Sequence, residues 1–202
     1  AEAAGGAPPP ISLGGCALVG GCFTGSNPTS RSPAGVDHTG DKPLRVCESG
    51  SILMHLAEKF GAFLPASGPQ RTEVINWLMW QMGSAPFLRG GFGHFYDYAP
   101  EKFEYPINRY AMEVKRQLDV LDKQLADNEF LAGSEYSIAD MATAPRYGRM
   151  VPEGAYEEAK TFLSAHEYKN VIRWATPILA RPPVQRGRQG EGDAGATPQP
   201  PP

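Results

Sequence analysis

Residues 43–65 read PLRVCESGSILMHLAEKFGAFLP. The first part, LRVC, is short and rich in strand-forming residues, and the ESGS after it has the composition of a helix start. Apolar residues then recur at the spacing of one helix face: Ile52, Leu53, Leu56, Ala57 and Phe60. Gly61 is a typical helix stop. We therefore predict a short strand that leads directly into an amphipathic helix.

The rest of the chain is dominated by helical periodicity. Apolar spacing predicts helices near 72–84, 137–147, 153–165 and 167–180, and a longer one that follows Pro106 and forms the spine of a bundle. Ser137 and Asp140 have the spacing of a capping box at a helix start. Strand signals are confined to 16–23 and 44–47. The prediction is a mostly α protein of the α+β class.

Composition excludes several classes of function. The 202 residues hold 19 Lys and Arg against 22 Asp and Glu, a net charge of −3, so nucleic acid is not an expected partner. No apolar run approaches the roughly 20 residues of a membrane span, and the start of the chain lacks the pattern of a signal peptide. We expect a cytoplasmic protein without a membrane partner. The three cysteines have no metal-site spacing, so no metal is expected.

A candidate site lies at the start of the first predicted helix. The free N–H groups and positive dipole of a helix N-terminus, with the Ser49 hydroxyl, suit a ligand carboxylate. Glu48 beside them suits a ligand ammonium, so the pair fits an amino-acid-like group. The alternative is ordinary capping of the helix by Ser49 or Ser51.

Six segments carry a resemblance to a known family: SRSPAGVD at 30–37, PLRVCESGSILMHLAEKFGAFLP at 43–65, NWLMW at 76–80, APFLRGGFGHFYDYAP at 85–100, INRYAMEVKRQLDVLDKQLA at 107–126 and YSIADMA at 136–142. Together they closely resemble the cytosolic glutathione transferases, in particular the nu-class-like group with disulfide-bond oxidoreductase activity. The resemblance implies a thioredoxin-like domain that binds glutathione, an all-helical C-terminal domain, and a homodimer.

The resemblance also implies site residues. Glu48 and Ser49 match the pair that holds the γ-glutamyl end of glutathione. Pro33 matches a cis-proline, and Ser32 matches the residue whose backbone pairs with the cysteinyl part; the alternative is a plain Ser-Pro turn. Arg109 matches an arginine that reaches glutathione carboxylates.

Alternatives and departures from the family at three further positions bear on the predicted glutathione site. An ordinary helix-surface ion pair of Arg109 with Glu104 or Glu113 is the alternative to glutathione binding. Met82 stands where the family offers a glutamine, because Gln81 and Met82 are in the opposite order. His94 reads as a core or dimer-contact histidine more readily than as an acid or base.

The N-terminal part departs from the family. The family places its catalytic Thr and Asn in a first βαβ unit, and residues 1–32 are too short and too rich in Gly and Pro for one, so no catalytic residue is identified. The expected domains are an irregular segment at 1–26, a partial, truncated thioredoxin-like domain at 27–65, an all-α domain at 70–186 and a disordered tail at 187–202.

Two functions follow from these expectations. The first is a glutathione-dependent transferase or thiol–disulfide oxidoreductase that acts on a small electrophile or a disulfide. The alternative is a non-catalytic, dimeric binding or structural module of the same family. A redox pair of Cys16 and Cys22 is a weaker third hypothesis, because their Gly-rich surroundings do not favour a reactive thiolate.

Overall fold

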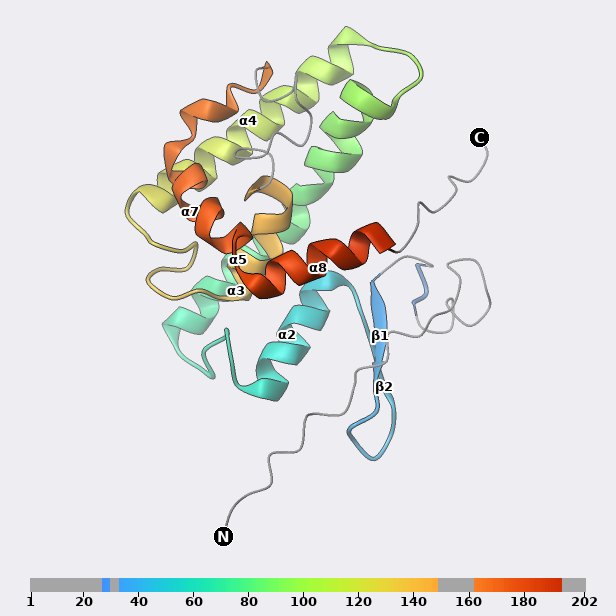
Figure 1. Cartoon of the computed structure of the whole chain (residues 1–202), viewed down its shortest axis with the longest axis vertical. Helices are drawn as coiled ribbons and strands as arrows, with labels where there is room; N and C mark the ends of the chain where they lie inside the picture. The colour runs from blue at the N-terminus through green and yellow to red at the C-terminus, as the bar shows by residue number, and fades with distance from the viewer. Residues whose placement is uncertain (1–26, 30–32, 149–161, 194–202) are drawn as a thin grey trace. The chain divides into compact units, whose positions relative to one another are not determined.

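The computed structural model describes residues 27–29, 33–148 and 162–193, and the chain divides into two units between Ala66 and Ser67 (Figure 1). Ser32, the predicted strand at 16–23 and most of the predicted helix at 153–165 lie outside the described residues. None of the helices in the described ranges has the length and apolar character needed to cross a lipid bilayer.

The first unit is a β-hairpin followed by a helix. Strands β1 (Ala34–Asp37) and β2 (Leu44–Cys47) pair antiparallel, from Ala34 opposite Cys47 to Asp37 opposite Leu44. Helix α2 (Ser49–Phe60) follows after one residue and contacts β2. It ends at Gly61, which has the left-handed φ of 62° expected of a C-terminal glycine. The structure thus confirms the predicted strand and helix of residues 44–61.

The second unit is helical. In chain order it contains α3 (Pro69–Pro86), η1 (Phe87–Tyr98), α4 (Glu104–Ala126), α5 (Ile138–Thr143), η2 (Ala144–Gly148), η3 (Ala165–Glu167), α7 (Lys169–Leu179) and α8 (Pro182–Asp193). Helix α4 packs against η1 and α7, and α3 packs against α5. The predicted spine is therefore present as α4.

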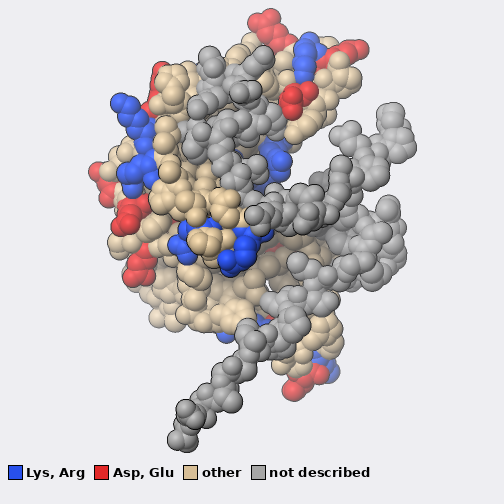
Figure 2. All heavy atoms as spheres, in the orientation of Figure 1, with Lys and Arg blue, Asp and Glu red and all other residues tan. Residues whose placement is uncertain are grey.

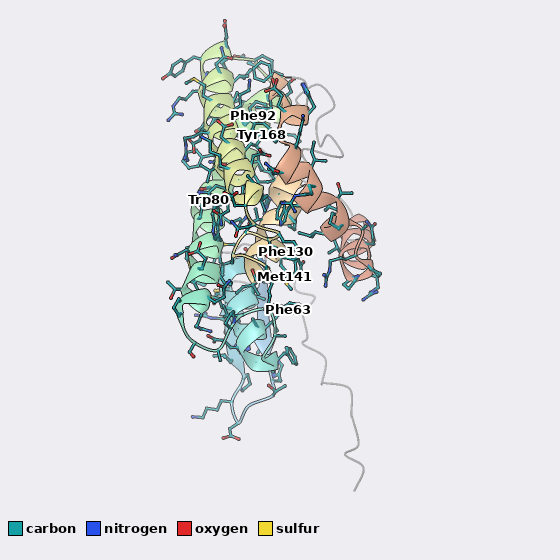
Figure 3. The ribbon with its side chains drawn as sticks, turned by 90° about the vertical axis from the view of Figure 1, so that its left-hand side faces the viewer. Phe63, Trp80, Phe92, Phe130, Met141 and Tyr168 are labelled. Carbon is teal, nitrogen blue, oxygen red and sulfur yellow. The ribbon has the colours of Figure 1, made fainter. Side chains whose placement is uncertain are left out.

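The core of this unit is built on one face of α4. The buried face consists of Ala111, Val114, Gln117, Leu118, Leu121 and Leu125. Aromatic side chains labelled in Figure 3 contribute to the packing: Phe92 and Tyr168 are buried, and the half-buried Trp80 lies against the ring of Tyr147. Burial of such apolar surface is the main stabilising contribution to a bundle of this kind.

Asp140 has the folding role that the sequence predicts. Its buried carboxylate accepts hydrogen bonds from the backbone N–H of Ser137 and from Leu131 N, each at 3.0 Å, and from the indole Nε1 of Trp174 at 2.8 Å. The first of these belongs to the capping box that begins α5. The Asp140 carboxylate thus joins the start of α5 to a neighbouring loop and to α7.

The segment GGFGHFY lies in η1, a π-helix that the sequence analysis did not predict. The wider π turn leaves Gly91 directly against the ring of Tyr110 on α4: a Cβ at this position would stand 2.6 Å from Cε1 of that ring. A glycine is therefore required for the close approach of η1 and α4.

Helix α8 continues to Asp193 and so extends into the first residues of the tail that is predicted to be disordered at 187–202. The helix starts at Pro182, which suits a first helical turn, and Gln185 donates from its backbone N to the carbonyl of Arg181 and from Nε2 to that of Leu179.

Candidate functional site

The register of the hairpin brings two predicted site residues to the same end. Ala34 pairs with Cys47, so Pro33 immediately before β1 and Glu48 immediately after β2 adjoin. Both side chains are exposed, as is Ser49. Ser32 lies outside the described residues, so this end of the hairpin contributes Pro33, Glu48 and Ser49 to the candidate site.

Glu48 has an unusual backbone conformation, with φ 68° and ψ 130°. A positive φ crowds the Cβ of any residue except glycine, and such a conformation costs about 1–3 kcal/mol. The Glu48 carbonyl accepts the N–H of Ile52 at 2.9 Å, and its side chain makes no capping hydrogen bond. The strained bend therefore turns the chain sharply from β2 into α2 and leaves the carboxylate available at the surface.

The N-terminus of α2 is suited to an anion. The N-cap position is occupied by Glu48 and not by Ser49 or Ser51. The N–H groups of residues 49–51 precede the first intrahelical hydrogen bond, and the first turn contains no acidic residue that would offset the helix dipole. A carboxylate can be bound here by N–H groups and the Ser49 hydroxyl, with the Glu48 carboxylate beside it for an ammonium.

A cluster around Asp37, which no pattern in the sequence indicates, lies at the opposite end of β1. Asp37 Oδ2 lies 2.7 Å from His55 Nε2 and 2.5 Å from Lys59 Nζ, and Oδ1 accepts the backbone N–H and the hydroxyl of Thr39. These hydrogen bonds, that of Lys59 above all, hold the pKa of Asp37 well below its usual range. His55 is half-buried, and its contact with Asp37 joins residues 18 apart in the chain.

Arg109 belongs to the second unit, where it is exposed on α4. Its neighbour Glu113 is held by Arg116, which donates to the two carboxylate oxygens at 3.0 and 2.6 Å. This bidentate contact is the main reason that the pKa of Glu113 falls to about 2, and the charge of Arg109 adds to the effect. The primary partner of Glu113 is thus Arg116 rather than Arg109.

Other candidates from the sequence are settled by burial. His94 is exposed and lies edge-on to Phe95, so the core alternative is wrong and the dimer-contact alternative stays a prediction. Gln81 is only 3% exposed, and its Oε1 has no hydrogen-bond partner within the described part of the chain. Cys47 is a free, half-buried thiol.

Figure 2 shows side chains of both signs spread over the face in view, without a continuous basic surface. Within the described residues, His, Cys, Asp and Glu form no group of three that could hold a metal ion. The groups at the hairpin end, a carboxylate and helix N–H groups, are of the kinds that bind the two charges of a small zwitterionic ligand.

Comparison with known proteins identifies the relatives of the chain. The glutathione S-transferase C-terminal domain family matches residues 104–176, from the start of α4 into α7. The disulfide-bond oxidoreductase YghU of Escherichia coli is 60% identical over 166 residues, 82% of this chain and 57% of that protein. Glutathione S-transferase 2 of Schizosaccharomyces pombe is 30% identical over 169 residues, 79% of this chain and 73% of that protein.

A solved structure extends the comparison to the fold. Glutathione transferase YghU from Streptococcus pneumoniae, complexed with glutathione, superposes with a TM-score of 0.81 at 54% identity, over 84% of this chain and 65% of that one. The chain thus spans less than two thirds of the length of the E. coli and S. pneumoniae proteins. The hairpin and α2, the helical unit and these similarities lead to one conclusion. The chain belongs to the glutathione transferase family.

Proposed function

We propose that the chain binds glutathione at the end of the hairpin and the start of α2, and that it acts as a glutathione-dependent transferase or thiol–disulfide oxidoreductase. One observation carries the proposal: Glu48 is held in a strained conformation at the N-cap of α2, so that its exposed carboxylate stands beside the first N–H groups of the helix. Strain of this kind is concentrated at functional sites. The complex of the S. pneumoniae relative with glutathione supports the choice of ligand.

Each residue of the site has a role that follows from its chemistry. Ser49 and the first N–H groups of α2 would bind the γ-glutamyl carboxylate, and Glu48 would bind the ammonium of the same group. The backbone of Ser32, before Pro33, would pair with the cysteinyl part. Arg109 would bind a carboxylate through its planar guanidinium. These residues hold and orient the ligand, and the group that activates the sulfur is not among them.

The reaction with a disulfide substrate would proceed by thiol–disulfide exchange. A glutathione thiolate attacks one sulfur of the substrate disulfide, so that a mixed disulfide forms and the other sulfur leaves as a thiolate, which takes up a proton. A second glutathione thiolate attacks the mixed disulfide at the glutathione sulfur, releasing the second substrate thiol and glutathione disulfide. A small electrophile would instead accept the first thiolate directly. The proposal includes a homodimer in the cytoplasm.

Glutathione binding by calorimetry tests the site. Ser49→Ala should weaken binding about fivefold or more, because a lost hydrogen bond costs about 1 kcal/mol. Glu48→Ala should weaken it at least as much, whereas Glu58→Ala, at the far end of α2, serves as the matched control and should bind as the wild type does. A wild-type chain that is folded and does not bind glutathione would refute the proposal.

Turnover on the same samples separates the two functions. Reduction of 2-hydroxyethyl disulfide with glutathione, or conjugation of an aryl halide, would support the enzyme. Binding without either activity would instead support the non-catalytic module of the same family.

A further inference from the structure

The carboxylate of Asp37 joins the hairpin to α2 at a point remote from the site. Its side chain is 8% exposed, and each of its oxygens accepts two hydrogen bonds: Thr39 binds Oδ1 twice, while His55 and Lys59 of α2 both bind Oδ2. Lys59 also donates to the Thr39 hydroxyl at 2.6 Å. This cluster of Asp37, Thr39, His55 and Lys59, here called the Asp37 clamp, therefore fastens the outer end of β1 to the last two turns of α2.

The clamp and the bend at Glu48 lie at opposite ends of the same pair of elements. From Ala34 to Asp37 the strand extends about 10 Å, at roughly 3.3 Å per residue. From Ser49 to Lys59 the helix extends about 15 Å, at 1.5 Å per residue. At one end the chain itself connects hairpin and helix through Glu48, and at the other end the clamp connects them. With both ends fixed, the angle between the hairpin and the axis of α2 is fixed as well.

That angle matters for the site because its two halves lie on different elements. Pro33 is attached to the hairpin, and Ser49 begins the helix. A rotation of α2 about Glu48 would move the helix N–H groups relative to Pro33. Glu48 would not resist such a rotation by itself, since its conformation is strained and a strained residue keeps its geometry only when the surrounding structure holds it.

We propose that Asp37 is a positioning residue for the glutathione site: through Lys59 and His55 it holds α2 at the angle that keeps Ser49 and Glu48 in register with Pro33. This inference rests on the proposed function, and it assigns to Asp37 a role without contact to the ligand.

The test compares variants of the clamp by glutathione calorimetry. Lys59→Met keeps the aliphatic stem and removes the cation, and we expect glutathione to bind at least fivefold more weakly. Asp37→Asn should have a similar effect. Lys59→Arg restores the ion pair and should bind within twofold of the wild type. Lys42→Met, which removes an exposed cation from the hairpin loop, is the matched control and should leave binding unchanged.

A double-mutant cycle separates positioning from general stability. If Asp37 acts by placing Ser49, then Asp37→Asn should cost much less affinity in a Ser49→Ala background than in the wild type. Equal losses in both backgrounds, with circular dichroism showing folded protein, would overturn the proposal.

The binding data also distinguish the two proposals. Wild-type binding that Ser49→Ala weakens, together with unchanged binding in Lys59→Met and Asp37→Asn, would refute the positioning role and leave the glutathione site standing. A folded wild-type chain without glutathione binding would refute both.

Discussion

The backbone conformation of Glu48 leads to a prediction about protein stability that does not depend on the ligand. At φ 68° and ψ 130°, close to the region that only glycine populates, a Cβ costs about 1–3 kcal/mol. Glycine lacks the Cβ, but its greater freedom in the unfolded chain costs about 0.5–1 kcal/mol. Glu48→Gly should therefore be more stable than Glu48→Ala by about 1 kcal/mol. In a chain of this size that difference corresponds to a melting temperature higher by about 2–4 °C.

The same pair of substitutions at Glu58 gives the control. Glu58 is exposed within α2, where the helical conformation favours alanine over glycine by about 1 kcal/mol. Thermal unfolding followed by circular dichroism should therefore rank glycine above alanine at position 48 and alanine above glycine at position 58. If Glu48→Gly melts at or below Glu48→Ala, the bend is not strained in solution and the argument from strain fails. Both variants at position 48 should bind glutathione weakly, because both lack the carboxylate.

Three further predictions concern stability. Gly91→Ala should destabilise the helical unit by about 1–3 kcal/mol, because the added methyl group would collide with the ring of Tyr110. Gly90→Ala, whose methyl group would meet no atom within 4 Å, should leave the stability unchanged or raise it by up to about 1 kcal/mol, and urea unfolding of both variants measures the difference. Tyr147→Phe should lower the free energy of unfolding by about 1–2 kcal/mol in the same assay, because the buried phenol donates a hydrogen bond to Gln117 Oε1 at 2.8 Å and removal of the hydroxyl leaves that oxygen unpaired. An unchanged urea midpoint would contradict the hydrogen bond. The lowered pKa of Asp37 means that its ionised carboxylate contributes fully to the free energy of unfolding above about pH 4, the pKa in the unfolded chain, and that this contribution is lost progressively as the pH falls below that value. Asp37→Asn should therefore reduce the slope of stability against pH on the acid side, and an unchanged slope would count against the ion pair.

The sequence predicts those parts of the fold that depend on local periodicity. Helices α2, α3 and α4 follow from apolar spacing, and the capping box of α5 from two residues three apart. Strand β1 was missed because AGVD has little strand preference of its own and is a strand through its pairing with β2. The π-helix was missed because its glycines indicate a loop, although in the structure one of them allows close packing against Tyr110.

The candidate site likewise has one part that the sequence predicts and another that it does not. Glu48 and Ser49 can be found from the sequence, because a strand followed by ESGS and a helical pattern is a local signal. The strain at Glu48 cannot, since it depends on the angle between β2 and α2. The contact of Asp37 with His55 joins residues 18 apart, and that with Lys59 residues 22 apart. Nothing in the spacing along the chain indicates that these three meet, so a histidine with a buried acidic partner looked like a surface residue.

The strain at Glu48 and the Asp37 clamp together determine how the hairpin would open away from α2. A bend that stores strain at Glu48 favours opening of the hairpin away from α2, and the Asp37 clamp opposes that opening. The helical unit has a buried core of its own on α4, so it does not need the clamp in order to stay folded. Weakening the clamp should therefore increase hydrogen exchange at the N–H groups of β1, β2 and the start of α2, while exchange in α4 stays the same. Equal increases in both units would mean that the chain unfolds as a whole, and Asp37 would then be a residue of global stability.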